Sequence, residues 1–88
     1  MYNQAMINNK RHKILEYNTV VQQENDGGYS VWVPSLPGCT SQWDNFEEAT
    51  ENIKEAISLY LDDDKAIEKY PDDAGTRQFL VPITYQYI

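Results

Sequence analysis

The chain of 88 residues has a single cysteine, Cys39, and no apolar run close to the ~20 residues that a membrane-spanning helix needs. One cysteine excludes the internal disulfide framework on which many small secreted domains depend. The first ten residues are polar and lack the apolar stretch of a secretory signal. We therefore expect a cytoplasmic protein with one small hydrophobic core and no membrane contact.

Basic residues are also scarce, since seven Lys and Arg stand against fourteen Asp and Glu, for a net charge of -7. Such a chain repels a phosphate backbone, so we expect no direct binding of nucleic acid. A small basic protein is a partner that would suit this charge.

Alternation of apolar and polar residues predicts a first strand over residues 13–24 and a second over residues 29–33. Between them, residues 25–28 read Asn-Asp-Gly-Gly, which is the chemistry of a tight hairpin turn. The segment 34–38 contains two prolines, which cannot donate to a strand ladder, and a short third strand is expected at 39–43. The three strands are expected to form an antiparallel meander.

Helical periodicity is the strongest pattern in the chain and predicts a helix from about Phe46 to Asp62. Asn45 can cap its start, with Glu48 completing a pair like a capping box. Ile67 continues the stripe, so the helix either extends to about residue 69 or resumes as a short second helix. The stripe consists of Phe46, Ala49, Ile53, Ala56, Ile57, Tyr60 and Leu61.

The C-terminal segment 78–88 alternates in the manner of a fourth strand, although Pro82 places it at an edge or near a bulge. The predicted fold is α+β in the order β-β-β-α-β, with one covering helix and the last strand returning parallel to the first. Residues 1–12 are expected to form a loose leader, and residues 13–88 a single domain. Because the last strand is apolar on both faces and one helix covers only one, we expect a homo-oligomer.

The stretch from Tyr29 to Cys39 is an aromatic-led strand that runs through a proline into Leu-Pro-Gly-Cys, and Asp44 to Ile57 reads as a capped helix. Together these segments resemble the HicB-family antitoxins over about residues 29–61. Ser35 departs from the acidic residue usual there, and Trp43 from the usual glycine.

This resemblance implies a HicB-like N-terminal domain, with a partial RNase-H-like fold that no longer catalyses. It also implies that the domain binds and blocks HicA, a small basic toxin that cleaves messenger RNA. Family members with the full layout carry a C-terminal DNA-binding region, and we expect this chain to lack one.

A catalytic RNase-H-like site needs carboxylates from the first strand, the helix and the fourth strand around two metal ions. Glu16, Glu51 and Glu55 could supply the first two elements, but residues 78–87 contain no acidic residue. Cys39 and His12 are the only candidates for a nucleophile and its base, and we interpret Cys39 as a small packed hydrophobe. We expect neither enzymatic activity nor a metal or cofactor.

Two acidic runs, residues 62–64 and 72–73, lack the spacing of a calcium loop, and we interpret both as solvated helix ends.

The residues that we assign to partner binding are Trp32, Trp43, Ser30 and Ser35. If Val31 and its strand neighbours face the helix, Trp32 lies on the uncovered face of the sheet, where aromatic residues often dominate interfaces. The alternative is that the leader or the C-terminal strand covers this face. Two functions stay open, namely a HicB-like antitoxin that binds a HicA-type toxin, and an orphan self-associating structural or regulatory protein without a toxin.

Overall fold

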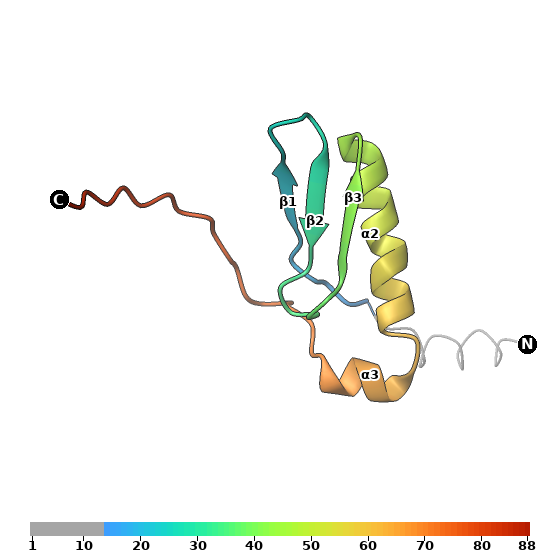
Figure 1. The fold of residues 1–88 in the computed structure, drawn as a ribbon. Helices are drawn as coiled ribbons and strands as arrows, with labels where there is room; N and C mark the ends of the chain where they lie inside the picture. Colours follow the sequence, from blue (N-terminus) through green and yellow to red (C-terminus); the bar gives the residue numbers. More distant parts are fainter. Residues whose placement is uncertain (1–13) are drawn as a thin grey trace, which may run out of the picture.

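The computed structural model describes residues 14–88, so the leader predicted at residues 1–12 lies outside the described residues. Within this range three short strands form one antiparallel sheet in the order β1-β2-β3, and a helix packs along it (Figure 1). A shorter helix follows, and the chain then extends away from the sheet. The elements are β1 (Val20–Gln23), β2 (Tyr29–Trp32), β3 (Thr40–Trp43), α2 (Phe46–Tyr60) and α3 (Asp64–Lys69).

The predicted hairpin between β1 and β2 is confirmed. Glu24 N–H donates to the Gly28 carbonyl at 2.7 Å, and Gly27 turns the chain at a φ of 98°, a conformation that glycine adopts without steric cost. β1 begins at Val20, later than the predicted residue 13. In the register between β1 and β2, residue 18 would lie opposite Pro34, beyond the end of β2. Pro34 has no N–H to donate, so the ladder does not continue there.

Helix α2 begins as its sequence predicts. Asn45 Oδ1 accepts the backbone N–H of Glu48 at 2.8 Å, and Asn45 Nδ2 donates to Glu48 Oε1 at 3.0 Å. The first bond satisfies a backbone N–H that has no partner within the helix, and the second joins the two side chains. α2 ends at Tyr60, and Asp63 caps α3 by accepting the N–H of Ala66 at 2.8 Å. Of the two alternatives for this region, the second short helix is the one that forms.

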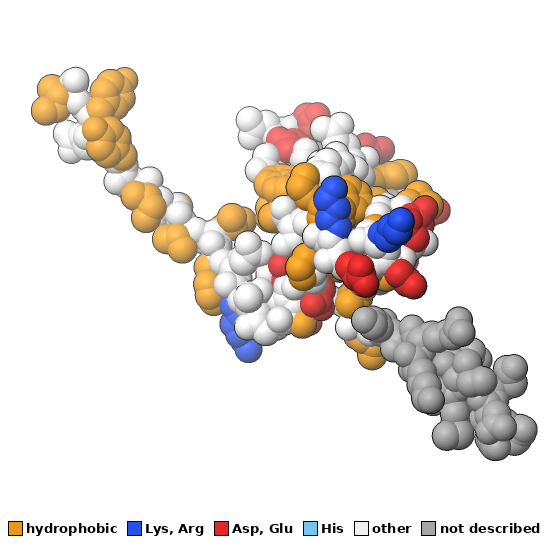
Figure 2. All heavy atoms as spheres, turned by 90° about the horizontal axis from the view of Figure 1, so that it is seen from below, with side chains coloured by type: hydrophobic (Ala, Val, Ile, Leu, Met, Phe, Trp, Pro, Cys, Tyr) orange, Lys and Arg blue, Asp and Glu red, His pale blue; other side chains and the backbone are white. Residues whose placement is uncertain are grey.

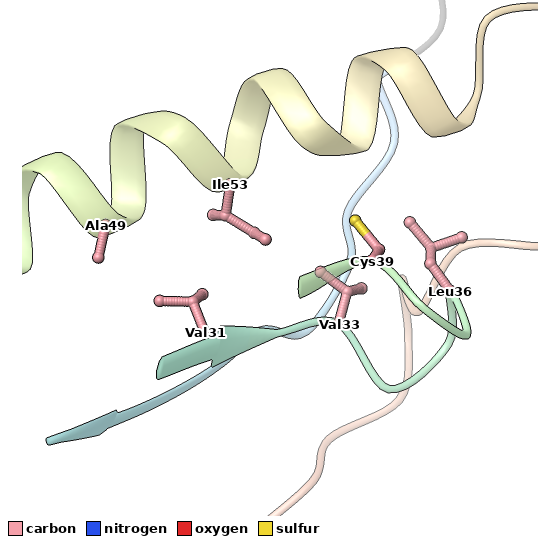
Figure 3. Close-up of a cluster of buried hydrophobic side chains, with 6 residues drawn as sticks. All are labelled: Val31, Val33, Leu36, Cys39, Ala49 and Ile53. Atoms are coloured by element: carbon pink, nitrogen blue, oxygen red, sulfur yellow. The ribbon is translucent and has the colours of Figure 1, made fainter. Parts of the chain in front are cut away.

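The core lies between α2 and one face of the sheet (Figure 3). The sticks in Figure 3 show Val31 and Val33 pointing toward Ala49 and Ile53 on the helix. The predicted direction of these two valines is therefore confirmed, and the alternation of side chains sends Trp32 to the opposite face. The core consists of Val31, Val33, Leu36, Cys39, Ala49 and Ile53.

The fourth strand predicted at the C-terminus is wrong. Residues 78–88, here called the arm, pair with no strand of the described chain and run outward from the body (Figures 1 and 2). Alternation gives a segment the side chains of a strand, but the strand forms only when another backbone takes up its N–H and C=O groups. The fold is thus a three-stranded meander under one helical layer. The exposed apolar residues of the arm are Phe79, Leu80, Val81, Ile83, Tyr85, Tyr87 and Ile88.

Candidate protein-binding surface

The sheet face opposite α2, here called the open face, carries no charged side chain. Residues directly opposite one another in an antiparallel sheet point to the same side, so the register with Trp32 identifies the members of this face. Because the rest of the chain is strongly acidic, this neutral face is a distinct surface. Its members are Val20, Gln22, Ser30, Trp32, Thr40 and Gln42.

Trp32 lies between two hollows of the open face. One, of about 450 Å³, is lined by β2 and β3 residues that include Ser30 and Thr40. The other, of about 600 Å³, lies between residues 18–21 of the first strand region and residues 78–80 at the start of the arm. The partly buried indole therefore has free space on both sides and the arm as a neighbour.

The four predicted partner-binding residues separate into three places. Trp32 and Ser30 share the open face. Trp43 pairs with Tyr29 and so lies on the helix side of the sheet, where it is 37% exposed. Ser35 lies in the connection between β2 and β3, where its hydroxyl donates to Asp73 Oδ1 at 2.6 Å. The structure thus brings together two of the four.

Asp72 and Asp73, which precede the arm, bind the backbone just before β1. The interpretation of this pair as a solvated helix end is therefore wrong. Asp73 Oδ2 accepts the N–H of Asn18 at 2.8 Å, and Asp72 Oδ2 accepts the N–H of Glu16 at 2.9 Å. Asp73 N–H donates to the Glu16 carbonyl at 2.7 Å. We call this set, with Ser35, the clamp; no sequence spacing indicates it, because its partners are more than 35 positions apart.

Two further bonds extend the clamp on either side. Tyr17 Oη donates to the Tyr70 carbonyl at 2.5 Å, and Asn18 Nδ2 donates to Gln78 Oε1 at 2.8 Å. Burial, with the charges of Asp72 and Asp73 as smaller causes, raises the pKa of Tyr17, which keeps its hydroxyl a donor. The arm therefore leaves the body from a fixed point beside the first strand.

A second surface of distinct character is the acidic stripe, formed by Glu47, Glu51 and Glu55 on the exposed side of α2. Their spacing of four places them one above another along the helix. Among the described residues one ion pair forms, between Lys54 and Glu51 at 3.1 Å, and both side chains are well exposed. All fourteen acidic residues lie in the described range, against four of the seven basic ones, so residues 14–88 carry a large excess of negative charge.

The predicted structural role of Cys39 is confirmed. Its side chain is 4% exposed within the core, and burial raises the pKa of the thiol. His12 lies outside the described residues. Across residues 14–88 no three His, Cys, Asp or Glu side chains are grouped so as to hold a metal ion. In the same range no helix has the length and apolar character needed to cross a membrane.

The described residues thus form a two-layer α+β domain with an uncharged sheet face, an apolar arm and an excess of acidic side chains. Over residues 17–77 the sequence matches the family described as HicB_like antitoxin of bacterial toxin-antitoxin system. The chain belongs to this family, and the resemblance drawn from its motifs is confirmed.

Two relatives and one solved structure align with 57% to 81% of this chain. The chain is 50% identical over 50 residues to the UPF0150 protein ssr1765 of Synechocystis sp., covering 57% of this chain and 63% of that protein, which is less than two thirds of its length. It is 44% identical over 54 residues to a UPF0150 protein of Archaeoglobus fulgidus, covering 61% and 78%. The crystal structure of the N-terminal domain of Burkholderia pseudomallei antitoxin HicB aligns with a TM-score of 0.48 and 25% identity, covering 81% of this chain and all of that one.

Proposed function

We propose that this chain is an antitoxin that binds and blocks a small, basic, messenger-RNA-cleaving toxin of the HicA type. Membership of the HicB-like antitoxin family supports the general role. The observation that carries the choice of partner is the excess of negative charge among the described residues, fourteen acidic side chains against four basic ones.

The acidic stripe is the surface on which we expect the toxin to bind. Glu47, Glu51 and Glu55 are exposed and carried on one rigid helix, whose opposite side is fixed by Ala49 and Ile53 in the core. A regular row of carboxylates attracts Lys and Arg side chains of a partner and steers its approach. Leu59, which is 70% exposed one turn beyond Glu55, adds an apolar contact at the end of this row.

The test is inhibition of RNA cleavage by a purified HicA-type toxin when the full chain is added. We expect the chain to stop cleavage, and the association to slow as salt is raised. Glu51→Gln combined with Glu55→Gln should slow association by about tenfold at low salt, because it removes two charges from the stripe.

The matched control is Asp64→Asn combined with Glu68→Gln on α3. It removes the same charge at the same spacing of four, away from the stripe. Equal loss in both double variants would mean that only net charge matters and would contradict binding at the stripe. If the chain leaves RNA cleavage unchanged and forms no complex with the toxin, the proposed function fails as a whole.

A second candidate function is an orphan, self-associating regulatory protein without a toxin. The uncharged open face and the apolar arm favour it, because neither surface offers anything to a basic partner. A gene for a short basic protein next to the gene for this chain would favour the antitoxin. Self-association of the purified chain without any complex with a basic toxin would favour the orphan.

A further inference from the structure

The arm is the largest exposed apolar feature of the described chain. Its seven large apolar residues are each at least 67% exposed, and they occupy both faces of the segment. Figure 2 shows these side chains standing clear of the body. Exposed apolar surface of this extent on a soluble chain marks a contact site, and a segment that is apolar on both faces is expected to be covered on both.

An acceptor for such a segment exists at the outer edge of β1. Glu24 N–H donates to Gly28, so alternation along the antiparallel ladder turns the even-numbered N–H groups of β1 toward β2. The N–H groups of Val21 and Gln23 consequently point outward. No strand of residues 14–88 pairs with this edge, and an unpaired edge readily accepts another strand.

The arm runs away from the outer edge of β1 in its own chain. Gln78 is held to Asn18, and the C-terminal segment, drawn toward red in Figure 1, runs outward from the sheet. Pro82 restricts Val81 to extended backbone, and no glycine follows Gly75 that would allow a sharp return. The segment 83–88 is therefore presented to a neighbouring molecule.

The chemistry of the arm suits a second copy of the same chain. Residues 78–88 contain no charged side chain, and neither does the open face beside β1. Two copies of net charge -7 can thus meet here without placing like charges in contact. Tyr85 and Tyr87 of two arms, four rings in all, bring roughly 600–1,000 Å² into the contact, which with their aliphatic neighbours reaches the size of a stable interface.

We propose that two copies of this chain exchange arms, with residues 83–88 of each adding as a strand to the outer edge of β1 in the other. Main-chain hydrogen bonds from Val21 and Gln23 would then hold the arm, while Tyr85 and its alternate neighbours cover apolar surface. This assembly is independent of any toxin, because the acidic stripe lies on α2 and is not used.

The first test is light scattering of the full chain at micromolar concentration, where we expect twice the chain mass of 10.2 kDa. Tyr85→Lys places a charge among the aromatic side chains of the arm, and Gln86→Lys places the same charge one position later, on the face where residues 83–88 carry Thr84 and Gln86. We expect the dimer dissociation constant to rise about 30-fold or more in the first variant and by less than about threefold in the second.

The second test is hydrogen exchange at the amides of Val21 and Gln23. We expect protection in the dimer and its loss in Tyr85→Lys, with the core amide of Ile53 unchanged as evidence that the variant is folded. A monomeric full chain would overturn the proposal, whether these amides are exposed or are protected by the chain's own arm. A dimer that Tyr85→Lys leaves intact, or one in which the two amides exchange freely, would overturn it as well.

Discussion

Ser35 Oγ donates a 2.6 Å hydrogen bond to Asp73 Oδ1, joining the β2–β3 connection to the segment before the arm across 38 positions of sequence. The same carboxylate accepts the N–H of Asn18 with its other oxygen. One aspartate thus fastens three separate parts of the chain. This contact lies on the segment that leads into the arm.

The first prediction concerns a second carboxylate at this contact. Ser35→Asp places two negative charges within hydrogen-bonding distance and removes a donor, and we expect it to lower the free energy of unfolding by about 1–3 kcal/mol at pH 7. The deficit should shrink as the pH falls toward 4, because protonation of one carboxyl restores a donor and removes the repulsion. Urea unfolding of wild type and Ser35→Asp at pH 7 and at pH 4 measures this difference in the free energy of unfolding.

Ser35→Ala is the control for that variant, since it loses the hydrogen bond without adding charge. It should cost about 1 kcal/mol at both pH values. A pH-independent deficit in Ser35→Asp would show that its effect is steric and would contradict the electrostatic account.

The second prediction concerns the core beneath α2. Ile53 is 4% exposed against the sheet, so Ile53→Ala should lower the free energy of unfolding by about 2–5 kcal/mol through lost burial and a cavity. Leu59→Ala, on the exposed side of the same helix, should change it by less than about 0.5 kcal/mol. Chemical denaturation of both variants provides the comparison, and similar losses would mean that α2 does not pack as described.

The third prediction concerns the N-terminus of α2. Asn45→Ala removes the acceptor for Glu48 N–H and should cost about 1 kcal/mol. Asn45→Asp keeps an acceptor and adds a negative charge at the positive end of the helix dipole, so it should be close to wild type. Thermal unfolding followed by circular dichroism distinguishes them. An aspartate variant as unstable as the alanine variant would argue against the cap.

The fourth prediction concerns pH and Cys39. Burial raises the pKa of the folded thiol above its ordinary value of 9.0, so the unfolded chain releases this proton first. The stabilisation is complete below pH 9 and is lost as the pH rises through the folded pKa. Between pH 8 and pH 10 the free energy of unfolding should therefore fall more in wild type than in Cys39→Ala. Equal falls in the two proteins would mean that Cys39 does not contribute.

Local sequence signals predicted the elements that depend on neighbouring residues. The glycines at 27 and 28, the cap at Asn45 and the apolar stripe of α2 act within a few positions, so they are readable before any tertiary contact is known. The direction of Val31 and Val33 followed from alternation once the helix was placed. The same reasoning failed for the arm, because strand alternation describes side chains and says nothing about which backbone will pair with them.

The amino-acid sequence by itself determined the meander, the capped helix, the acidic balance and the membership of the family, since each rests on residue type and short spacing. Tertiary structure alone decided that Trp32 and Trp43 lie on opposite sides of the sheet, because strand register sets that relation. It also decided that Asp73 bonds Asn18 and Ser35 and that the arm stands free. These outcomes depend on contacts between residues 38 and 55 positions apart, whose geometry is set only when the whole domain has packed.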